Sequence, residues 1–120
     1  LGTAREFAAL FAALAAGEVV STPVSERVVG WLSPVGDVGL VGATVGGDPF
    51  SYTPDGHGLV HFAKTGRERG VRADAGVVAG RRGAFAYALV VAFDDLSLLH
   101  RHRAHAAFHA LGGDLLEYAT

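Results

Sequence analysis

Apolar runs and short polar connections follow one another in the middle of the chain. Three apolar runs cover residues 59–63, 73–79 and 84–93, and glycine-containing connections at residues 67–70 and 80–83 separate them. Short apolar runs joined by tight glycine turns are typical of consecutive antiparallel hairpins. The pattern therefore predicts a three-stranded meander over residues 59–93.

A pair of helices is predicted before the meander, within residues 1–34. Thr3 and Glu6 have the spacing of a capping box, and the apolar residues that follow recur at helical spacing: Phe7, Leu10, Phe11 and Leu14. These signals predict a first helix over residues 3–16. Thr22 and Pro23 have the pattern of a cap followed by a proline in the first turn. We expect them to open a second helix that ends before residue 34.

A last helix is predicted over residues 95–118. Its apolar residues fall on one side of a helical wheel, at Leu96, Leu99, Ala106, Ala107, Ala110 and Leu111. Three histidines fall on another side, at His102, His105 and His109. The Gly112-Gly113 pair could end or kink this helix, although two leucines follow it.

Residues 35–58 have the least regular pattern, with seven glycines and two prolines. Residues 38–45 could form an irregular strand, and residues 55–58 a turn. Either a solvated surface loop or a loop near the entrance of a site fits this composition.

Composition limits the class of protein. The chain has 120 residues, a formal net charge of −2 and no cysteine, and half of its residues are hydrophobic. That length fits one domain, and the hydrophobic fraction argues against disorder. The charge gives no reason to expect nucleic acid, and thiolate chemistry and disulfides are excluded. No apolar run is long enough to span a bilayer, and no signal peptide is visible.

The triplet Lys64-Thr65-Gly66 follows the first apolar run, and the segment 69–72, Arg-Gly-Val-Arg, follows the triplet. With the two further strands and the terminal helix, this arrangement resembles the penicillin-recognising serine hydrolases, most closely the class A β-lactamases. The resemblance covers nearly all of residues 1–120 and implies the C-terminal portion of one such domain. The fold it implies is α+β, an antiparallel sheet with helices packed on it.

The resemblance also implies roles for the triplet and its neighbour. Lys64 and Thr65 would bind the carboxylate of a substrate, the lysine through its charge and the threonine through its hydroxyl. Gly66 would leave room for the substrate backbone against the strand, and the main-chain N–H of Arg67 would contribute to an oxyanion hole. The alternative for Lys64 is a solvated lysine at the end of a strand.

Arg72 matches an arginine that reaches the substrate carboxylate from the neighbouring strand in many class A relatives. A guanidinium suits that role because it binds a carboxylate through two parallel hydrogen bonds. The alternative is an exposed arginine paired with Asp74 or Glu68, which contributes little. The first turn is one residue shorter than the commonest class A arrangement, so the register between Lys64 and Arg72 stays open.

The nucleophile of the family lies in a Ser-x-x-Lys motif that these 120 residues do not contain. Lys64 is the only lysine, and neither a Ser-Asp-Asn triplet nor a Glu-x-x-x-Asn segment occurs. Two hypotheses follow. The chain is part of a β-lactamase-like serine hydrolase whose nucleophile lies in a missing N-terminal segment or a second chain, or it is a non-catalytic binding or structural protein. The first implies a small or peptide-like carboxylate substrate, no cofactor, and a secreted or cell-envelope location.

The histidines give a weaker signal. His102, His105 and His109 could bind a transition metal on one helix face, but a solvent-facing polar stripe explains the same spacing. No cysteine is present and no acidic residue is spaced to complete a tetrahedral site, so we expect no metal. His57 and His61 are expected at a sheet edge or in a loop rather than in catalysis.

Overall fold

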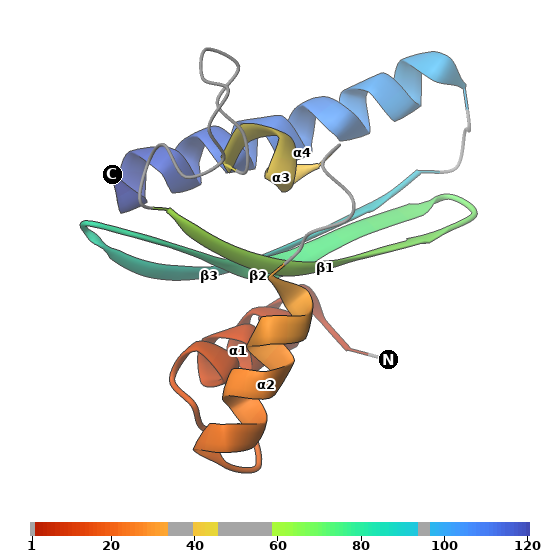
Figure 1. Cartoon of the computed structure of the whole chain (residues 1–120). Helices are drawn as coiled ribbons and strands as arrows, with labels where there is room; N and C mark the ends of the chain where they lie inside the picture. The colour runs from red at the N-terminus through yellow and green to blue at the C-terminus, as the bar shows by residue number, and fades with distance from the viewer. Residues whose placement is uncertain (1, 34–39, 46–58, 94–96) are drawn as a thin grey trace.

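The computed structural model describes residues 2–33, 40–45, 59–93 and 97–120. The elements in chain order are α1 (Ala4–Ala15), α2 (Thr22–Leu32), α3 (Val41–Val45), β1 (Val60–Glu68), β2 (Val71–Gly80), β3 (Gly83–Ala92) and α4 (Leu98–Ala119). The strands form the middle layer, with α1 and α2 on one face and α3 and α4 on the other (Figure 1). The predicted α+β fold is confirmed.

The sheet is an antiparallel meander in the order β1-β2-β3, as the sequence predicts. Both turns are two residues long, at positions 69–70 and 81–82, so the strands are longer than expected. The prediction that the first turn begins at Arg67 is wrong, because Arg67 and Glu68 pair with Arg72 and Val71 as the last residues of the ladder. The Lys64-Thr65-Gly66 triplet consequently lies within β1 and not at its end.

The helix starts are set by side-chain caps. Thr3 Oγ1 accepts a hydrogen bond from Glu6 N at 3.1 Å, and the Glu6 carboxylate accepts one from Thr3 N at 3.2 Å, which confirms the capping box. The cap of α2 is Ser21, whose hydroxyl accepts from Val24 N at 3.3 Å. Thr22, predicted as the cap, is instead the first helical residue.

Each face of the sheet carries its own core. Phe62 and Val77 pack against Phe11 and Leu14 on the α1 side. On the other face, the sheet contributes Ala63, Val78 and Tyr87 to a larger core with α3 and α4. Residues that alternate along a strand point to opposite faces, so these two cores fix which way every strand residue points.

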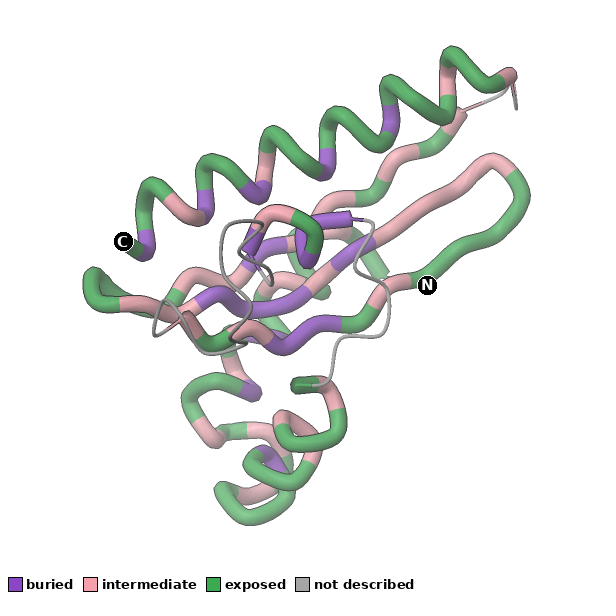
Figure 2. The backbone as a smooth tube through the Cα atoms, turned by 45° about the horizontal axis from the view of Figure 1, so that its top comes forward, coloured by how far each residue is buried: buried purple, intermediate pink, exposed green. Residues whose placement is uncertain are grey.

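The buried face of α4 differs from the predicted one. The predicted side is largely exposed, with Leu99 56% exposed, and Leu96 lies outside the described residues. The buried residues of α4 are Ala104, Phe108, Gly112, Leu115 and Ala119. Figure 2 shows the buried positions of this helix along the side nearer the sheet. Alanines bury little area and set no direction, whereas Phe108 and Leu115 bury large side chains. The larger side chains therefore decide which side of the helix is buried.

The contact between α3 and α4 depends on Gly112. A Cβ atom there would lie 2.7 Å from Thr44 Cβ, so only glycine lets the helices approach this closely. The glycine pair neither ends nor kinks α4, which continues to Ala119. Residues 41–45 form a helix, so the prediction of an irregular strand there is wrong. Positions 46–58 and 34–39 lie outside the described residues.

Candidate functional site

The Lys64-Thr65-Gly66 triplet lies on the edge strand of the described sheet, since β1 pairs with β2 alone. Lys64 is exposed, and its Nζ donates a hydrogen bond to the carbonyl oxygen of Thr65 at 2.6 Å. An edge strand presents backbone donors and acceptors that an extended ligand can pair with. The triplet therefore places a positive charge beside a row of backbone groups.

The two-residue turn determines which backbone groups point outward. The pair that closes such a hairpin, Glu68 with Val71, exchanges hydrogen bonds, and the alternate pairs of the ladder do not. Thr65 and Arg67 belong to those alternate pairs, so their N–H and C=O groups point away from β2. The bond from Lys64 Nζ to Thr65 O agrees with this direction. The N–H of Arg67 is thus oriented toward the open side of the strand.

Gly66 lies between these two outward-facing residues. A Cβ atom built at Gly66 would meet no described atom within 4 Å, so packing within the described chain does not require glycine there. Gly76 on β2 is a contrast, because a Cβ there would lie 2.4 Å from the carbonyl oxygen of Phe62. The space beside Gly66 is compatible with a ligand backbone lying along the strand.

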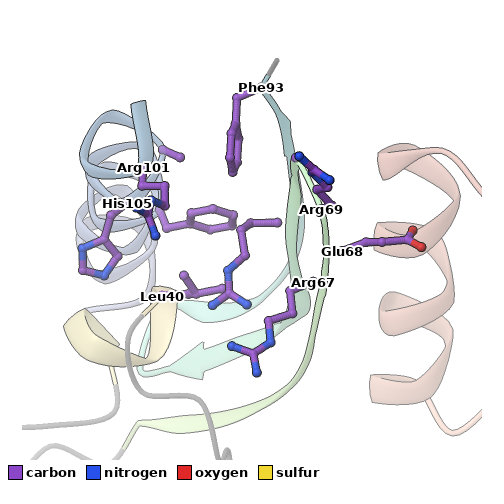
Figure 3. Close-up of a pocket in the computed structure, with 11 residues that line it drawn as sticks. Leu40, Arg67, Glu68, Arg69, Phe93, Arg101 and His105 are labelled. Atoms are coloured by element: carbon purple, nitrogen blue, oxygen red, sulfur yellow. The ribbon is translucent and has the colours of Figure 1, made fainter. Parts of the chain in front are cut away.

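Arg72 is separated from Lys64 by the sheet. Arg72 lies opposite Arg67, and both point to the α4 face, where they line a cavity with Phe108. Lys64 shares its face with Phe62, which packs against α1. The structure therefore brings Lys64, Thr65, Gly66 and Arg67 onto one edge and places the Arg72 side chain on the opposite face from the lysine. Glu68, considered above as a partner for Arg72, points to the α1 side (Figure 3).

Polar side chains form a buried hydrogen-bonded chain on the α4 face of the sheet, and its role was not predicted from the sequence. Tyr87 donates its hydroxyl hydrogen to Asp74 Oδ1 at 3.0 Å, and His61 Nε2 lies 2.9 Å from the same hydroxyl. Asp74 Oδ2 accepts from the N–H of Val41 at 3.1 Å, which ties α3 to the sheet. A single carboxylate within an apolar strand, 2% exposed here, was the signal that could have indicated it.

Burial sets the protonation of this chain of residues. Desolvation lowers the pKa of His61 to about 4, so its ring is neutral near pH 7. Burial, together with the charge of Asp74 and the hydrogen bond to it, raises the pKa of Tyr87 well above its ordinary value. The Tyr87 hydroxyl uses its hydrogen on Asp74, so it accepts from His61, whose proton must then be on Nε2.

Three histidines lie on the surface of α4. His102, His105 and His109 are exposed, and the rings of the last two have centroids 4.4 Å apart. Within the described residues, no group of three histidines, cysteines or acidic residues is placed to hold a metal ion. His57, Asp94 and Asp95 lie outside those residues.

The helices that the structure describes include none with the length and apolar character needed to cross a membrane.

Comparison with known proteins gives one family and several solved structures. The model of the beta-lactamase enzyme family matches residues 1–119. A β-lactamase from Sphaerobacter thermophilus aligns with a TM-score of 0.70 and 21% identity, over 93% of this chain and 38% of that protein. PBP-A aligns with a TM-score of 0.70 and 19% identity, over 94% of this chain and 39% of that one.

A point mutant of PBP-A, solved as an acyl-enzyme complex with penicillin G, aligns with a TM-score of 0.69 and 19% identity. No curated protein matches the chain. The chain thus spans about two-fifths of the length of these solved structures. At such identities the structural likeness shows the fold.

Proposed function

The chain belongs to the beta-lactamase enzyme family, and we propose that it forms part of a serine hydrolase that cleaves an amide or ester bond of a carboxylate-bearing substrate. The observation that carries the proposal is the free edge of β1. There the charge of Lys64 and the outward-facing backbone of Thr65 and Arg67 lie along one side of a strand.

In this proposal each residue of the edge has a separate role. Lys64 and Thr65 hold the substrate carboxylate at the strand edge, the ammonium group from the α1 face and the hydroxyl from the α4 face, and together they supply charge and a directed donor. Gly66 leaves room for the substrate backbone. The N–H of Arg67 donates to the carbonyl oxygen as it becomes an oxyanion, which requires a donor fixed in position before the reaction. Its place in the strand ladder provides that fixed position.

The proposal takes the nucleophile from outside these 120 residues, which contain no Ser-x-x-Lys motif. A missing N-terminal segment or a second chain would supply a serine that attacks the carbonyl and forms an acyl-enzyme, which water then hydrolyses. We place such an enzyme in the secreted or cell-envelope fraction.

The test is whether the full-length protein that carries this chain becomes acylated. The protein is incubated with penicillin G and, separately, with an activated ester, and its intact mass is measured over time. The proposal predicts a mass increase equal to one acyl group, or turnover of the compound. A folded protein that neither gains mass nor consumes either compound would contradict the proposal and favour a non-catalytic binding role.

A further inference from the structure

Two histidines lie side by side on consecutive turns of α4. The ring centroids of His105 and His109 are 4.4 Å apart, and the ring planes are inclined by 54°, so the contact is not a face-to-face stack. Both side chains are exposed. Residues four apart in a helix share one side of it. The role proposed for the free edge of β1 uses neither ring, so the pair is a separate feature of the fold.

The separation of the two rings is the one that a shared cation requires. Imidazole nitrogens bind zinc at about 2.0–2.1 Å, and two rings that meet one ion at roughly a right angle have centroids about 4.5 Å apart. The observed 4.4 Å agrees with this value. Each ring uses only one of its two nitrogens on the ion, and an exposed side chain changes rotamer rapidly. Small rotations of the two side chains therefore bring one nitrogen of each ring to a common point.

The helix backbone fixes the spacing of the pair. Ala104 and Phe108 directly precede the two histidines, and both are buried. Phe108 packs in the larger core, which holds this part of α4 in place. The unfolded chain does not keep residues 105 and 109 at this separation, so an ion that binds both stabilises the folded state. The spacing is consequently present before an ion arrives.

The ligands and the surrounding charge select the kind of ion. Magnesium and calcium prefer oxygen ligands, whereas imidazole suits zinc, nickel and copper. Arg101 and Arg103 add positive charge nearby, and Figure 3 shows Arg101 and His105 on neighbouring turns of α4. That charge repels a cation held by electrostatic attraction alone. A transition-metal ion held by coordinate bonds to two nitrogens is the ion that fits this surface.

From these observations we infer that His105 and His109 form a two-histidine site for a divalent transition-metal ion whose other coordination positions are open to solvent. Across the described part of the chain, no group of three histidines, cysteines or acidic residues is placed to hold an ion, so the site is an open chelate. It differs from the closed tetrahedral site of a structural metal, which needs four ligands from the protein. The ion joins two turns of α4 just before Gly112 and Gly113, the residues of that helix with the lowest helix propensity.

The experiment is a calorimetric titration of the full-length protein, free of any histidine tag, with zinc and, separately, with copper(II). The inference predicts saturable binding of both ions, tighter for copper, and no binding of magnesium. His105→Gln and His109→Gln should each weaken zinc binding at least tenfold, because a single remaining imidazole forms no chelate. Both residues are exposed, so neither variant should lower the melting temperature of the metal-free protein.

His102→Gln is the matched control, since His102 is an exposed histidine of the same helix. It should change the affinity for zinc less than threefold. Equal losses in all three variants would mean that the histidine-rich surface attracts ions without a defined site, which overturns the inference. A parent protein that binds no zinc would overturn it as well.

Melting temperatures test whether the folded helix sets the spacing. Zinc at about a hundredfold excess over its Kd should raise the melting temperature of the parent by at least about 2 °C. The His105→Gln/His109→Gln variant should show no such rise. The same rise in both proteins, or none in the parent, would contradict a site that depends on these two turns of α4.

Discussion

Lys64 and Arg72 project from opposite faces of the three-stranded sheet. Arg72 lies directly opposite Arg67 in the ladder, and three positions separate Arg67 from Lys64 along β1. Because successive strand residues alternate between faces, that separation reverses the direction of the side chain. The two cations that the family resemblance assigns to one carboxylate therefore point to opposite faces of the same sheet.

A double-mutant cycle in the full-length protein measures this separation. We expect the effects of Lys64→Ala and Arg72→Ala on the acylation rate to add, with a coupling below about 0.5 kcal/mol, because Arg72 lies on the inner strand and points to the face opposite Lys64. The rates of the parent, both single variants and the double variant give the coupling. A value above about 1 kcal/mol would show that both side chains hold the same group.

Replacing Gly66 with alanine should separate function from stability. The added methyl meets no described atom within 4 Å, so the melting temperature should stay the same or rise slightly. A substrate backbone against the strand would collide with it, and the acylation rate should fall at least tenfold. Gly76→Ala is the matched control. Its methyl would meet the Phe62 carbonyl at 2.4 Å, so it should destabilise the fold by about 1–3 kcal/mol.

The stability of the protein should depend on the protonation of His61. Its pKa is about 4 in the folded chain, against an ordinary value of 6.5. Between these two pH values the unfolded chain binds a proton that the folded chain does not, so stability falls as the pH falls from 6.5 to 4. Allowing for the exposed part of the ring, we expect His61 to contribute about 1–2 kcal/mol to this loss.

Melting temperatures of the parent and His61→Gln, measured from pH 7 to pH 4, isolate this contribution. Glutamine keeps a donor for the Tyr87 hydroxyl but does not titrate. The stability difference between parent and variant should therefore shift against the parent as the pH falls. A difference that stays constant over this range would mean that His61 is protonated equally in both states.

Two neighbouring glycines of α4 should respond in opposite directions to alanine. Gly112→Ala places a methyl 2.7 Å from Thr44 Cβ and should cost about 1–3 kcal/mol by separating α3 from α4. Gly113→Ala adds a methyl in open space within a helix, where alanine is favoured over glycine by about 1 kcal/mol. Denaturant unfolding of both variants tests this. Equal effects of the two substitutions would contradict the α3–α4 contact.

Local signals in the sequence predicted much of the fold. The capping box at Thr3 and the two glycine-containing turns have short-range chemical causes, so both could be predicted without the structure. The buried side of α4 could not, because Ala106, Ala107 and Ala110 fit either side of a helix. Only the packing of Phe108 against the sheet decides between them.

The sequence identifies the triplet at Lys64 by its motif, which is a short-range signal. It does not give the direction of each side chain, because that direction depends on the strand register. The register follows from a turn of two residues, whereas the sequence predicted a connection over residues 67–70. Asp74 bonds to Tyr87 of β3 and to Val41 of α3, and His61 of β1 joins them through the Tyr87 hydroxyl. No short-range pattern joins those elements.

The most direct test of the account compares acylation and stability in Lys64→Ala. Lys64 is exposed, so its truncation should change the melting temperature little. Its charge-assisted bond to the substrate carboxylate would be lost, at a cost on the order of 2–4 kcal/mol, or roughly 30- to 1,000-fold in rate.

The measurement is the acylation rate of the full-length protein by a fluorescent penicillin, with the melting temperature recorded beside it. Thr65→Val serves as a second variant that loses a neutral donor and should slow acylation less. The account predicts a slow, fully folded Lys64→Ala protein. A variant that acylates as fast as the parent, or that loses its fold, would contradict the role proposed for the free edge of β1.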